Sequence, residues 1–290
     1  MFSPKSLHSV NHMTSRRIFL SMLTAGALSE GAKSFSGPLG LQTYSLRREM
    51  ARDVEGTLAI IRELGFTELE ATSPSGVRPE IFRKRLDALG IRVTSTNTGW
   101  EQFAEDTKRI IGNAQALGAR YIMCPGIPHK DVLTLDDCRL AITSFNKWGE
   151  QFRAAGIRFV YHPHGPEFQP SPDGTLLDTL AKGMQPGIAD FEMDTFWFVW
   201  PGQDPVAFLN KYRGRAILMH LKDLQKGVKG DLNPNAPESV DVPVGTGQVD
   251  WPAVLRASAG SVERYYIEDG SPDPVAHIRQ SLAYLHAVRY

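Results

Sequence analysis

The sequence lacks several features that would place it in a specialised class of protein. Only Cys124 and Cys138 occur among its 290 residues, which is too few for a disulfide scaffold, and we expect both to be packed free thiols. Lys plus Arg and Asp plus Glu each number 32, so the net charge is zero. Because phosphate neutralisation carries most nucleic-acid affinity, this balance argues against a nucleic-acid partner. It gives no reason to expect an anionic membrane surface as partner either.

The chain also lacks a hydrophobic run long enough to span a bilayer. The mildly apolar stretch 18–28 is shorter than the roughly 20 residues that a spanning helix needs. Arg16 and Arg17 directly precede it, and this order resembles a cleavable twin-arginine export signal. We predict a signal peptide over residues 1–36, a mature domain over 37–290, a periplasmic or exported location and no stable membrane association after cleavage. The alternative is a disordered basic tail.

The rest of the chain alternates strand-like apolar runs with amphipathic helical stretches. The predicted strands are 39–44, 66–71, 91–97, 119–125, 157–162, 188–194, 215–221 and 263–268. The predicted helices are 54–64, 79–89, 101–117, 135–155 and 205–212. Before a following strand, four helices end at a glycine that can take the left-handed conformation: Gly65, Gly90, Gly118 and Gly156.

Eight strands with crossover helices predict an α/β protein with a parallel sheet. No GxGxxG follows the first strand, which disfavours a dinucleotide-binding sheet. Eight units in about 250 residues favour a closed (β/α)8 TIM barrel, and no inner linker divides it into more than a single domain.

Four polar residues end four of these strands: His162, Asp194, His220 and Glu268. The carboxyl ends of barrel strands meet at one rim, where the active sites of such proteins lie. Imidazoles and carboxylates together suit a divalent metal. One buried histidine alone is usually a packed core residue, but four coincidences at strand ends favour a shared site. Residues two apart share a strand face, so Lys222 lies on the side of His220.

Motifs around these positions resemble those of the sugar phosphate isomerase/epimerase family, which has the xylose-isomerase-like TIM barrel. The resemblance covers residues 39–288. It rests on YHPH at 161–164, EF at 167–168, MDTFW at 193–197, MHLKD at 219–223, VGTGQVDW at 244–251 and YIED at 266–269. These motifs are specific for the fold and weak for the substrate, because one fold serves many reactions.

The resemblance implies a divalent cation, Mn²⁺, Mg²⁺, Co²⁺ or Zn²⁺, held by His162, Asp194, His220 and Glu268. His162 stands where the ketose epimerase branch has a glutamate, so the paired glutamates of that branch are incomplete here. The candidates for acid, base or oxyanion-holding roles are Glu268, His164, Lys222, Glu70 and Glu167, with structural roles as the alternative. The candidates for stacking on a sugar are Trp197 and Phe196, with Trp100 as an opposite wall.

These features predict a divalent-metal-dependent isomerase or epimerase that removes a proton next to a metal-bound carbonyl of an unphosphorylated sugar or sugar derivative. The alternative is a lyase or dehydratase that cleaves a keto-sugar or 3-keto-glycoside by β-elimination. A phosphodiester hydrolase and a non-catalytic sugar-binding module are further hypotheses. The expected partner is a small carbohydrate, and a homo-oligomer is left open. The polar segment 225–241 is predicted to be a long insertion over the rim.

Overall fold

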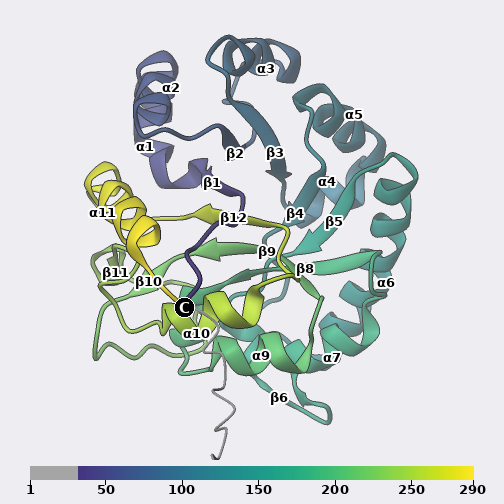
Figure 1. Cartoon of the computed structure of the whole chain (residues 1–290). Coiled ribbons are helices and arrows are strands. Elements are labelled where there is room, and N and C mark those ends of the chain that lie inside the picture. Colours follow the sequence, from purple (N-terminus) through teal and green to yellow (C-terminus); the bar gives the residue numbers. More distant parts are fainter. Residues whose placement is uncertain (1–31) are drawn as a thin grey trace, which may run out of the picture. The chain divides into compact units, whose positions relative to one another are not determined.

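The computed structural model describes residues 32–290, so the twin arginines and apolar stretch of the predicted export signal lie outside the described residues. Eight parallel strands close into a barrel in the order β1-β12-β9-β8-β5-β4-β3-β2 (Figure 1). Their bounds are β1 (Leu39–Gln42), β2 (Glu68–Glu70), β3 (Arg92–Asn97), β4 (Tyr121–Cys124), β5 (Arg158–Tyr161), β8 (Ala189–Asp194), β9 (Ala216–Leu221) and β12 (Arg264–Ile267). Each predicted strand range contains one of them, and the predicted single-domain TIM barrel is confirmed.

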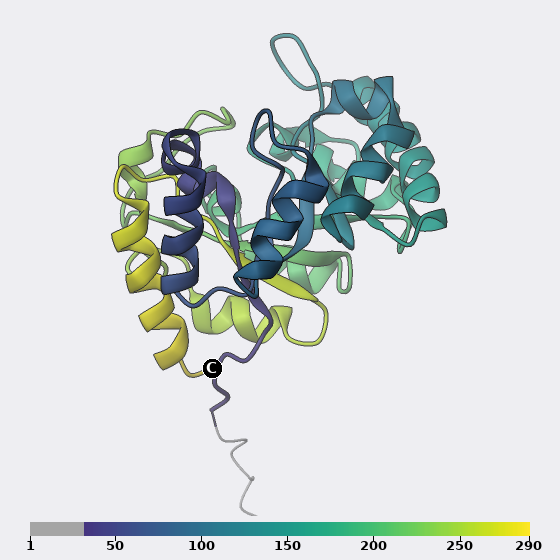
Figure 2. The ribbon, with the colours of Figure 1, turned by 90° about the horizontal axis from the view of Figure 1, so that it is seen from above.

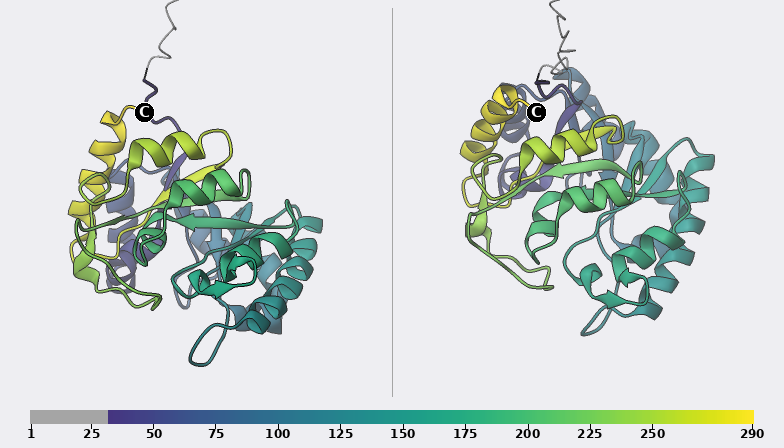
Figure 3. Two further views of the ribbon diagram at one scale, coloured as in Figure 1. Left: turned by 90° about the horizontal axis from the view of Figure 1, so that it is seen from below. Right: turned by 60° about the horizontal axis from the view of Figure 1, so that its bottom comes forward.

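Helices cover the outside of the barrel, as Figures 1 and 2 show. They are α1 (Arg47–Arg52), α2 (Val54–Glu63), α3 (Pro79–Ala88), α4 (Trp100–Glu105), α5 (Thr107–Leu117), α6 (Leu135–Ala154), α7 (Leu176–Gly183), α8 (Thr195–Val199), α9 (Pro205–Lys211), α10 (Trp251–Ser258) and α11 (Pro274–Ala287). α9 and α10 lie side by side (Figure 3). Within the described residues, no helix is both long and apolar enough to cross a membrane.

The predicted helix ends and one predicted helix can be compared directly with the structure. The four glycines that precede strands have φ between 69° and 88°, which is the left-handed conformation expected of a glycine that ends an α-helix. The predicted helix 101–117 is wrong as a single element, because it is divided into α4 and α5. Asp106 has a non-helical backbone at the junction, with φ −151° and ψ 76°, and its side chain accepts a hydrogen bond from the Arg109 backbone N–H to cap α5.

Short elements complete the loops at the carboxyl ends of the strands. Two small antiparallel pairs are β6 (Pro170–Ser171) with β7 (Gly174–Thr175), and β10 (Asp223–Leu224) with β11 (Asp241–Val242). Three 3-10 helices are η1 (Thr43–Leu46), η2 (Pro166–Phe168) and η3 (Glu238–Val240). The β10–β11 pairing joins the two ends of the predicted insertion 225–241, which therefore leaves and returns beside β9.

Alternate residues of each strand face either the helices or the barrel interior. Toward the helices, strand residues such as Phe159, Phe191 and Met219 join the main hydrophobic core. The middle of the interior is filled by a separate apolar cluster: Tyr121, Met123, Val160, Ile217, Leu218 and Tyr266. This layer closes the barrel beneath the carboxyl ends of the strands, so the polar residues above it share a space at one rim.

Candidate metal centre

The four predicted metal ligands lie at the carboxyl ends of β5, β8, β9 and β12. Asp194 ends β8, His220 is the penultimate residue of β9, and His162 and Glu268 directly follow β5 and β12. Asp194, His220 and Glu268 offer ligand atoms within 4.8 Å of one another. His162 lies next to this group of three, because its ring centroid is 4.7 Å from that of His220. The fold therefore brings together residues that are far apart in the sequence.

Each carboxylate of this group has one oxygen held by the protein and one directed at His220. Asp194 Oδ1 accepts a hydrogen bond from the Phe196 backbone N–H at 2.8 Å, and Glu268 Oε1 accepts one from Lys222 Nζ at 2.8 Å. Asp194 Oδ2 and Glu268 Oε2 lie 3.7 Å and 3.0 Å from His220 Nδ1. The two side chains are thus held so that the second oxygen of each carboxylate faces His220 Nδ1.

Three buried atoms of the predicted ligands have no hydrogen-bond partner within the described part of the chain: Asp194 Oδ2, His220 Nδ1 and His162 Nδ1. An unsatisfied buried polar atom costs about 1–3 kcal/mol, so three together indicate a group that they are built to hold. A divalent cation accepts lone pairs from both imidazole nitrogen and carboxylate oxygen. The donor set therefore fits a cation of the Mn²⁺, Co²⁺ or Zn²⁺ kind better than one that prefers oxygen alone, such as Mg²⁺.

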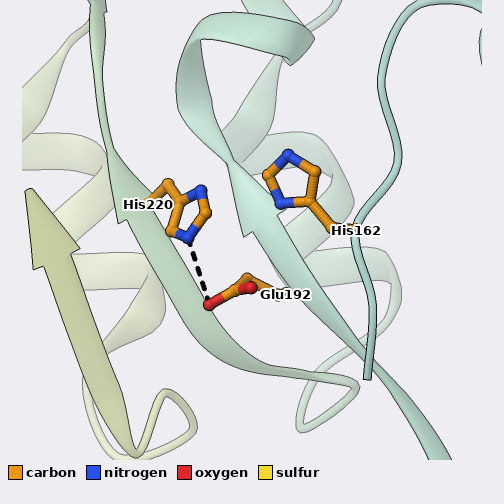
Figure 4. A group of neighbouring side chains, drawn as sticks. All are labelled: His162, Glu192 and His220. Carbon is orange, nitrogen blue, oxygen red and sulfur yellow. Dashed lines mark ion pairs between the residues drawn. The ribbon is translucent and has the colours of Figure 1, made fainter. Parts of the chain in front are cut away.

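Two further carboxylates lie behind His220. His220 Nε2 is 3.0 Å from Glu70 Oε1 and 3.3 Å from Glu192 Oε1, and Figure 4 shows the Glu192 contact. Gln42 and Ser95 donate hydrogen bonds to the Glu70 carboxylate. A carboxylate on the far nitrogen of a ligating histidine fixes the ring and makes it a better ligand. Glu70 was a candidate acid or base, but its fully buried side chain lies behind the ligands.

Glu192 was not among the predicted site residues, although the sequence of β8 contains a signal for it. Glu192 stands two residues before Asp194 in β8, so both side chains face the barrel interior. His162, Glu192 and His220 offer ligand atoms within 4.8 Å of one another, and neither Glu192 oxygen has a hydrogen-bond partner within residues 32–290. Strand parity applied to β8 would have placed this carboxylate beside the predicted ligands.

The charges at the centre are strongly coupled. Burial would lower the pKa of His220, but the Glu192 and Glu268 carboxylates hold it well above its ordinary value. Burial would raise the pKa of Glu268, but Lys222 and His220 hold it well below its ordinary value. Burial and the neighbouring Glu70 raise the pKa of Glu192. Glu268 is therefore ionised at neutral pH, and a cation bound at His220 Nδ1 would replace a proton.

The two histidines after β5 are neutral at the same pH. Burial, reinforced by His164 and His220, lowers the pKa of His162 well below its ordinary value. Burial lowers the pKa of His164 to about 4. The His162 and His164 ring centroids are 4.7 Å apart, and the His164 ring lies 4.9 Å from that of Trp197. Neutral imidazoles have lone pairs available, so this side of the site can bind a cation or accept a proton.

A cavity of about 570 Å³ opens above these residues. Of the predicted site residues, those that line it are His162, His164, Phe196, Trp197, His220, Lys222 and Glu268. Lys222 Nζ lies 5.2 Å and 5.8 Å from the ring centroids of Phe196 and Trp197, so an ammonium and two aromatic rings share one wall. The insertion contributes residues 234–238 and Asp241, and Gln42, Tyr44 and Arg47 come from the first strand and its loop.

Lys222 links the centre to the insertion. Its Nζ is 2.8 Å from Glu268 Oε1 and 3.5 Å from Asp241 Oδ2. Burial would lower its pKa, but these carboxylates hold the pKa of Lys222 above its ordinary value. Asp241 Oδ2 also accepts a hydrogen bond from the Gly270 backbone N–H at 2.6 Å. Lys222 is therefore a fixed cation that connects β9, β12 and β11 at the rim.

Two predicted site residues have other surroundings. Glu167 is buried, accepts hydrogen bonds from the Tyr161 hydroxyl and the His164 backbone N–H, and so holds the loop after β5. Trp100 was expected to form an opposite wall of the cavity. Its ring instead packs edge-on against Phe145 and Trp148 of α6, with centroids 5.5 Å and 4.7 Å away, because α4 begins at Trp100 and directs it into the helix layer.

Comparison with known proteins agrees with this architecture. The family model described as "xylose isomerase-like TIM barrel" matches residues 58–260. An inosose dehydratase of Geobacillus thermodenitrificans is 24% identical over 239 residues, and the match covers 72% of this chain and 79% of that protein. A solved sugar phosphate isomerase/epimerase from Parabacteroides distasonis has a TM-score of 0.71 and 26% identity, covering 89% of this chain and 96% of that one. The IOLI protein with a bound zinc atom has a TM-score of 0.66 at 12% identity, covering 85% and 95% of the two chains, and shares the fold.

Proposed function

This chain belongs to the xylose isomerase-like TIM barrel family, and we propose that it is a metal-dependent lyase that removes a hydroxyl or alkoxyl group β to the ketone of a sugar or cyclitol. Asp194, His220, Glu268 and His162 would hold the divalent cation. When bound there, a divalent cation supplies Lewis acidity toward a carbonyl oxygen. The similarity to an inosose dehydratase supports the proposal, because that name describes an elimination from a keto-cyclitol.

The observation that carries the proposal is the difference between the proton-transfer groups around the cavity. After β5 stands the neutral imidazole of His164, whereas Lys222 and Glu268, after β9 and β12, form a fixed ion pair. An epimerase must take a proton from one face of a carbon and return it to the other, which requires two groups of similar basicity. An elimination needs one base and one group that stabilises the departing oxygen, and this site contains that unequal pair.

His164 is the proposed acid–base residue. Its neutral ring accepts the proton on the carbon next to the ketone, and the electron pair of that C–H bond forms the new double bond. The C–O bond at the β carbon breaks, and its electron pair leaves with the oxygen. The imidazolium, a strong acid because burial lowers its pKa to about 4, then gives the proton to that oxygen. Lys222 holds the departing oxygen by its charge.

Glu268 is less suited to this role than the sequence analysis expected. One of its oxygens is bound by Lys222, and the other faces His220 Nδ1. Its pKa lies well below the ordinary value, because Lys222 and His220 outweigh the opposing effect of burial. Both oxygens of Glu268 are thus engaged by groups of the site, which leaves neither of them free to accept a proton from the substrate. We therefore assign Glu268 to cation binding.

The charge of the cavity wall favours a substrate without phosphate. Arg47 and Lys222 are the arginine and lysine side chains that line it among the described residues, and both are paired with carboxylates. Arg47 is 2.5 Å from Glu238, and Lys222 is 2.8 Å from Glu268. Phe196 and Trp197 offer apolar faces on which the C–H groups of a sugar can pack. These features support an uncharged carbohydrate.

An isomerase or epimerase is the second candidate, favoured by the 26% identity to the solved isomerase/epimerase from Parabacteroides distasonis. The two reactions differ in what leaves the substrate. Mn²⁺-loaded protein should be incubated in deuterated water with 2-keto-inositol and with methyl 3-keto-glucoside, and the products followed by NMR. We expect release of water or methanol and a new unsaturated ketone.

His164→Ala should lower this turnover by about 10²–10⁴-fold without loss of bound metal, as expected for removal of an acid–base group. The elimination would be contradicted if deuterium entered an inverted carbon while every C–O bond stayed intact. That outcome would establish the second candidate.

A further inference from the structure

Tyr44 is an exposed aromatic residue at the edge of the cavity. Among the described residues, the large hydrophobic side chains that are mostly exposed are Tyr44 at 55%, Val132 at 56% and Leu140 at 61%. Of these three, Tyr44 lines the cavity above the candidate metal centre. An aromatic ring that stays exposed beside a concave site is a common feature of ligand binding, because it offers a large contact area with few rotatable bonds.

The Tyr44 ring is held in place by its neighbours. The Tyr44 backbone N–H donates to Gln42 Oε1 at 3.0 Å, which fixes the turn after β1. The Arg47 guanidinium lies over the ring, 4.5 Å from its centroid, and donates to the Tyr44 carbonyl at 3.2 Å. Glu238 of the insertion pairs with Arg47 at 2.5 Å. A ring ordered in this way loses little entropy when a ligand packs on its remaining surface.

The cavity extends well beyond a single sugar ring. Its volume of about 570 Å³ falls within the range of roughly 300–1,000 Å³ for pockets that enclose drug-sized ligands. The buried end contains the metal ligands with Phe196 and Trp197, and the open end contains Tyr44, Arg47, Glu238 and residues 234–237 of the insertion. The cavity is therefore lined by aromatic side chains from two separate elements, Tyr44 in η1 and Phe196 and Trp197 in α8.

The charge at the open end also restricts the ligand. The Glu238 carboxylate pairs with Arg47 at 2.5 Å and with Arg48 at 2.8 Å, so the Arg47 side chain that lines this end has a carboxylate partner. The rest of this end offers the Tyr44 ring and the apolar side chains of Pro234, Ala236 and Pro237. Sugar rings combine apolar C–H faces with hydroxyl groups and carry no charge. An uncharged pyranose or aromatic aglycone matches this aromatic and apolar surface.

We propose that Tyr44, with Arg47, Glu238 and residues 234–237, forms a second carbohydrate subsite, and that the substrate is a two-ring glycoside. One ring binds over the metal ligands against Trp197, and the second ring stacks on Tyr44. This inference rests on the proposed function in one respect: the bond between the rings is the C–O bond that the elimination breaks. The proton from His164 then goes to the oxygen of the departing second ring.

Binding can be tested without turnover. Isothermal titration calorimetry on the Zn²⁺-loaded full chain should compare cellobiose and maltose with the methyl glucosides of matching linkage. We expect at least one disaccharide to bind about fivefold to tenfold more tightly than its methyl glucoside, as stacking on one aromatic ring allows. Tyr44→Ala should abolish this advantage and Tyr44→Phe should retain it. Leu140→Ala, which removes an equally exposed apolar side chain from α6, is the matched control and should change neither affinity.

The proposal is overturned if neither disaccharide binds more tightly than its methyl glucoside, or if Tyr44→Ala leaves the advantage intact. A preference that depends on Tyr44, in a protein that performs no elimination, would support the subsite and contradict the lyase. Elimination from methyl 3-keto-glucoside with no preference for a second ring would contradict the subsite and leave the lyase supported. The two proposals therefore fail separately.

Discussion

His220 has carboxylates near both of its ring nitrogens, and this arrangement separates the ligands of the centre from the groups that hold them. On the Nδ1 side, Asp194 and Glu268 present free oxygens toward the same point. On the Nε2 side, Glu70 and Glu192 are fully buried and contact the ring from below the cavity. The first pair can share an ion with the imidazole, and the second pair sets the direction in which the imidazole points.

Removing either supporting carboxylate should therefore weaken metal binding without removing a ligand. For Glu70→Gln and Glu192→Gln we expect the Kd for Zn²⁺ to rise about 10–100-fold, the usual effect of losing an outer partner of a ligating histidine. Calorimetric titration of the metal-free protein with Zn²⁺ measures this Kd. Glu263→Gln, at the opposite end of the barrel, is the control and should leave the Kd unchanged. Unchanged affinity in both variants would show that Glu70 and Glu192 do not position His220.

At the scale of elements, what could be predicted depended on how local the signal was. All eight strands were predicted because most of them are short apolar runs, and glycines with positive φ mark the helix ends before β2, β3, β4 and β5. The division between α4 and α5 was missed, since the apolar spacing continues across Asp106, whose side chain caps the start of α5. Tyr44 and Arg47 were missed because they follow β1 in a short polar turn, and their place on the cavity depends on the distant Glu238.

For the site as well, what could be predicted depended on how local the signal was. The strand-end residues Asp194, His220 and Glu268 could be predicted to converge, because a closed barrel brings strand ends together. The surroundings of Glu70, Glu167 and Trp100 could not, since they depend on side-chain direction and on contacts between separate elements.

Asp178 shows how one carboxylate joins two helices. It accepts hydrogen bonds from Lys211 Nζ and the Tyr212 hydroxyl, both at 2.7 Å, and completes the capping box of α7 with Thr175. Burial would raise its pKa, but the bonds from Lys211, Tyr212 and Thr175 lower it. A carboxyl whose folded pKa lies below its unfolded value of about 3.9 stabilises the protein above that pH. This contribution is lost as the pH falls through the folded pKa.

Asp178→Asn should therefore lower the free energy of unfolding at pH 7 by about 1–3 kcal/mol, as for hydrogen bonds to a charged group. The difference from the wild type should shrink as the pH falls below about 4. Urea unfolding at several pH values measures both effects. Asp87→Asn, which alters an exposed ion pair with Arg83 at 3.6 Å, is the control and should cost less than about 1 kcal/mol. An Asp178 effect that did not depend on pH would contradict the assigned ionisation.

At the scale of the whole barrel, the two ends of the strands have different roles. The carboxyl ends hold the candidate metal centre, whereas near the amino ends Asp190 is buried between two arginines. Asp190 Oδ1 lies 3.1 Å from Arg215, and Asp190 Oδ2 lies 3.0 Å from Arg158. The apolar interior layer that includes Leu218 and Tyr266 separates these groups from the site. In such a barrel, the first end determines function and the second contributes to stability.

Asp190→Asn should accordingly separate stability from metal binding. This change leaves the buried Arg215 guanidinium without its carboxylate, whereas Arg158 keeps its pairing with Glu263, and it should lower the free energy of unfolding by about 3–5 kcal/mol. The Kd for Zn²⁺ of the folded variant should remain that of the wild type, because the apolar layer lies between Asp190 and the ligands. Urea unfolding and calorimetry on the same preparation provide both values. A marked loss of metal affinity in folded Asp190→Asn would contradict this division.

The metal content of the purified protein tests the central claim most directly. Elemental analysis after dialysis against Mn²⁺ or Zn²⁺ should give one ion per wild-type chain. Asp194→Ala and His220→Ala should each lose this ion while keeping the circular dichroism spectrum of the barrel, because each removes a donor that is fixed toward the shared point. Asp204→Asn, at the exposed cap of α9, is the control and should retain the ion. A full complement of metal in both folded variants would contradict the site, as would a folded wild-type chain that binds no divalent cation.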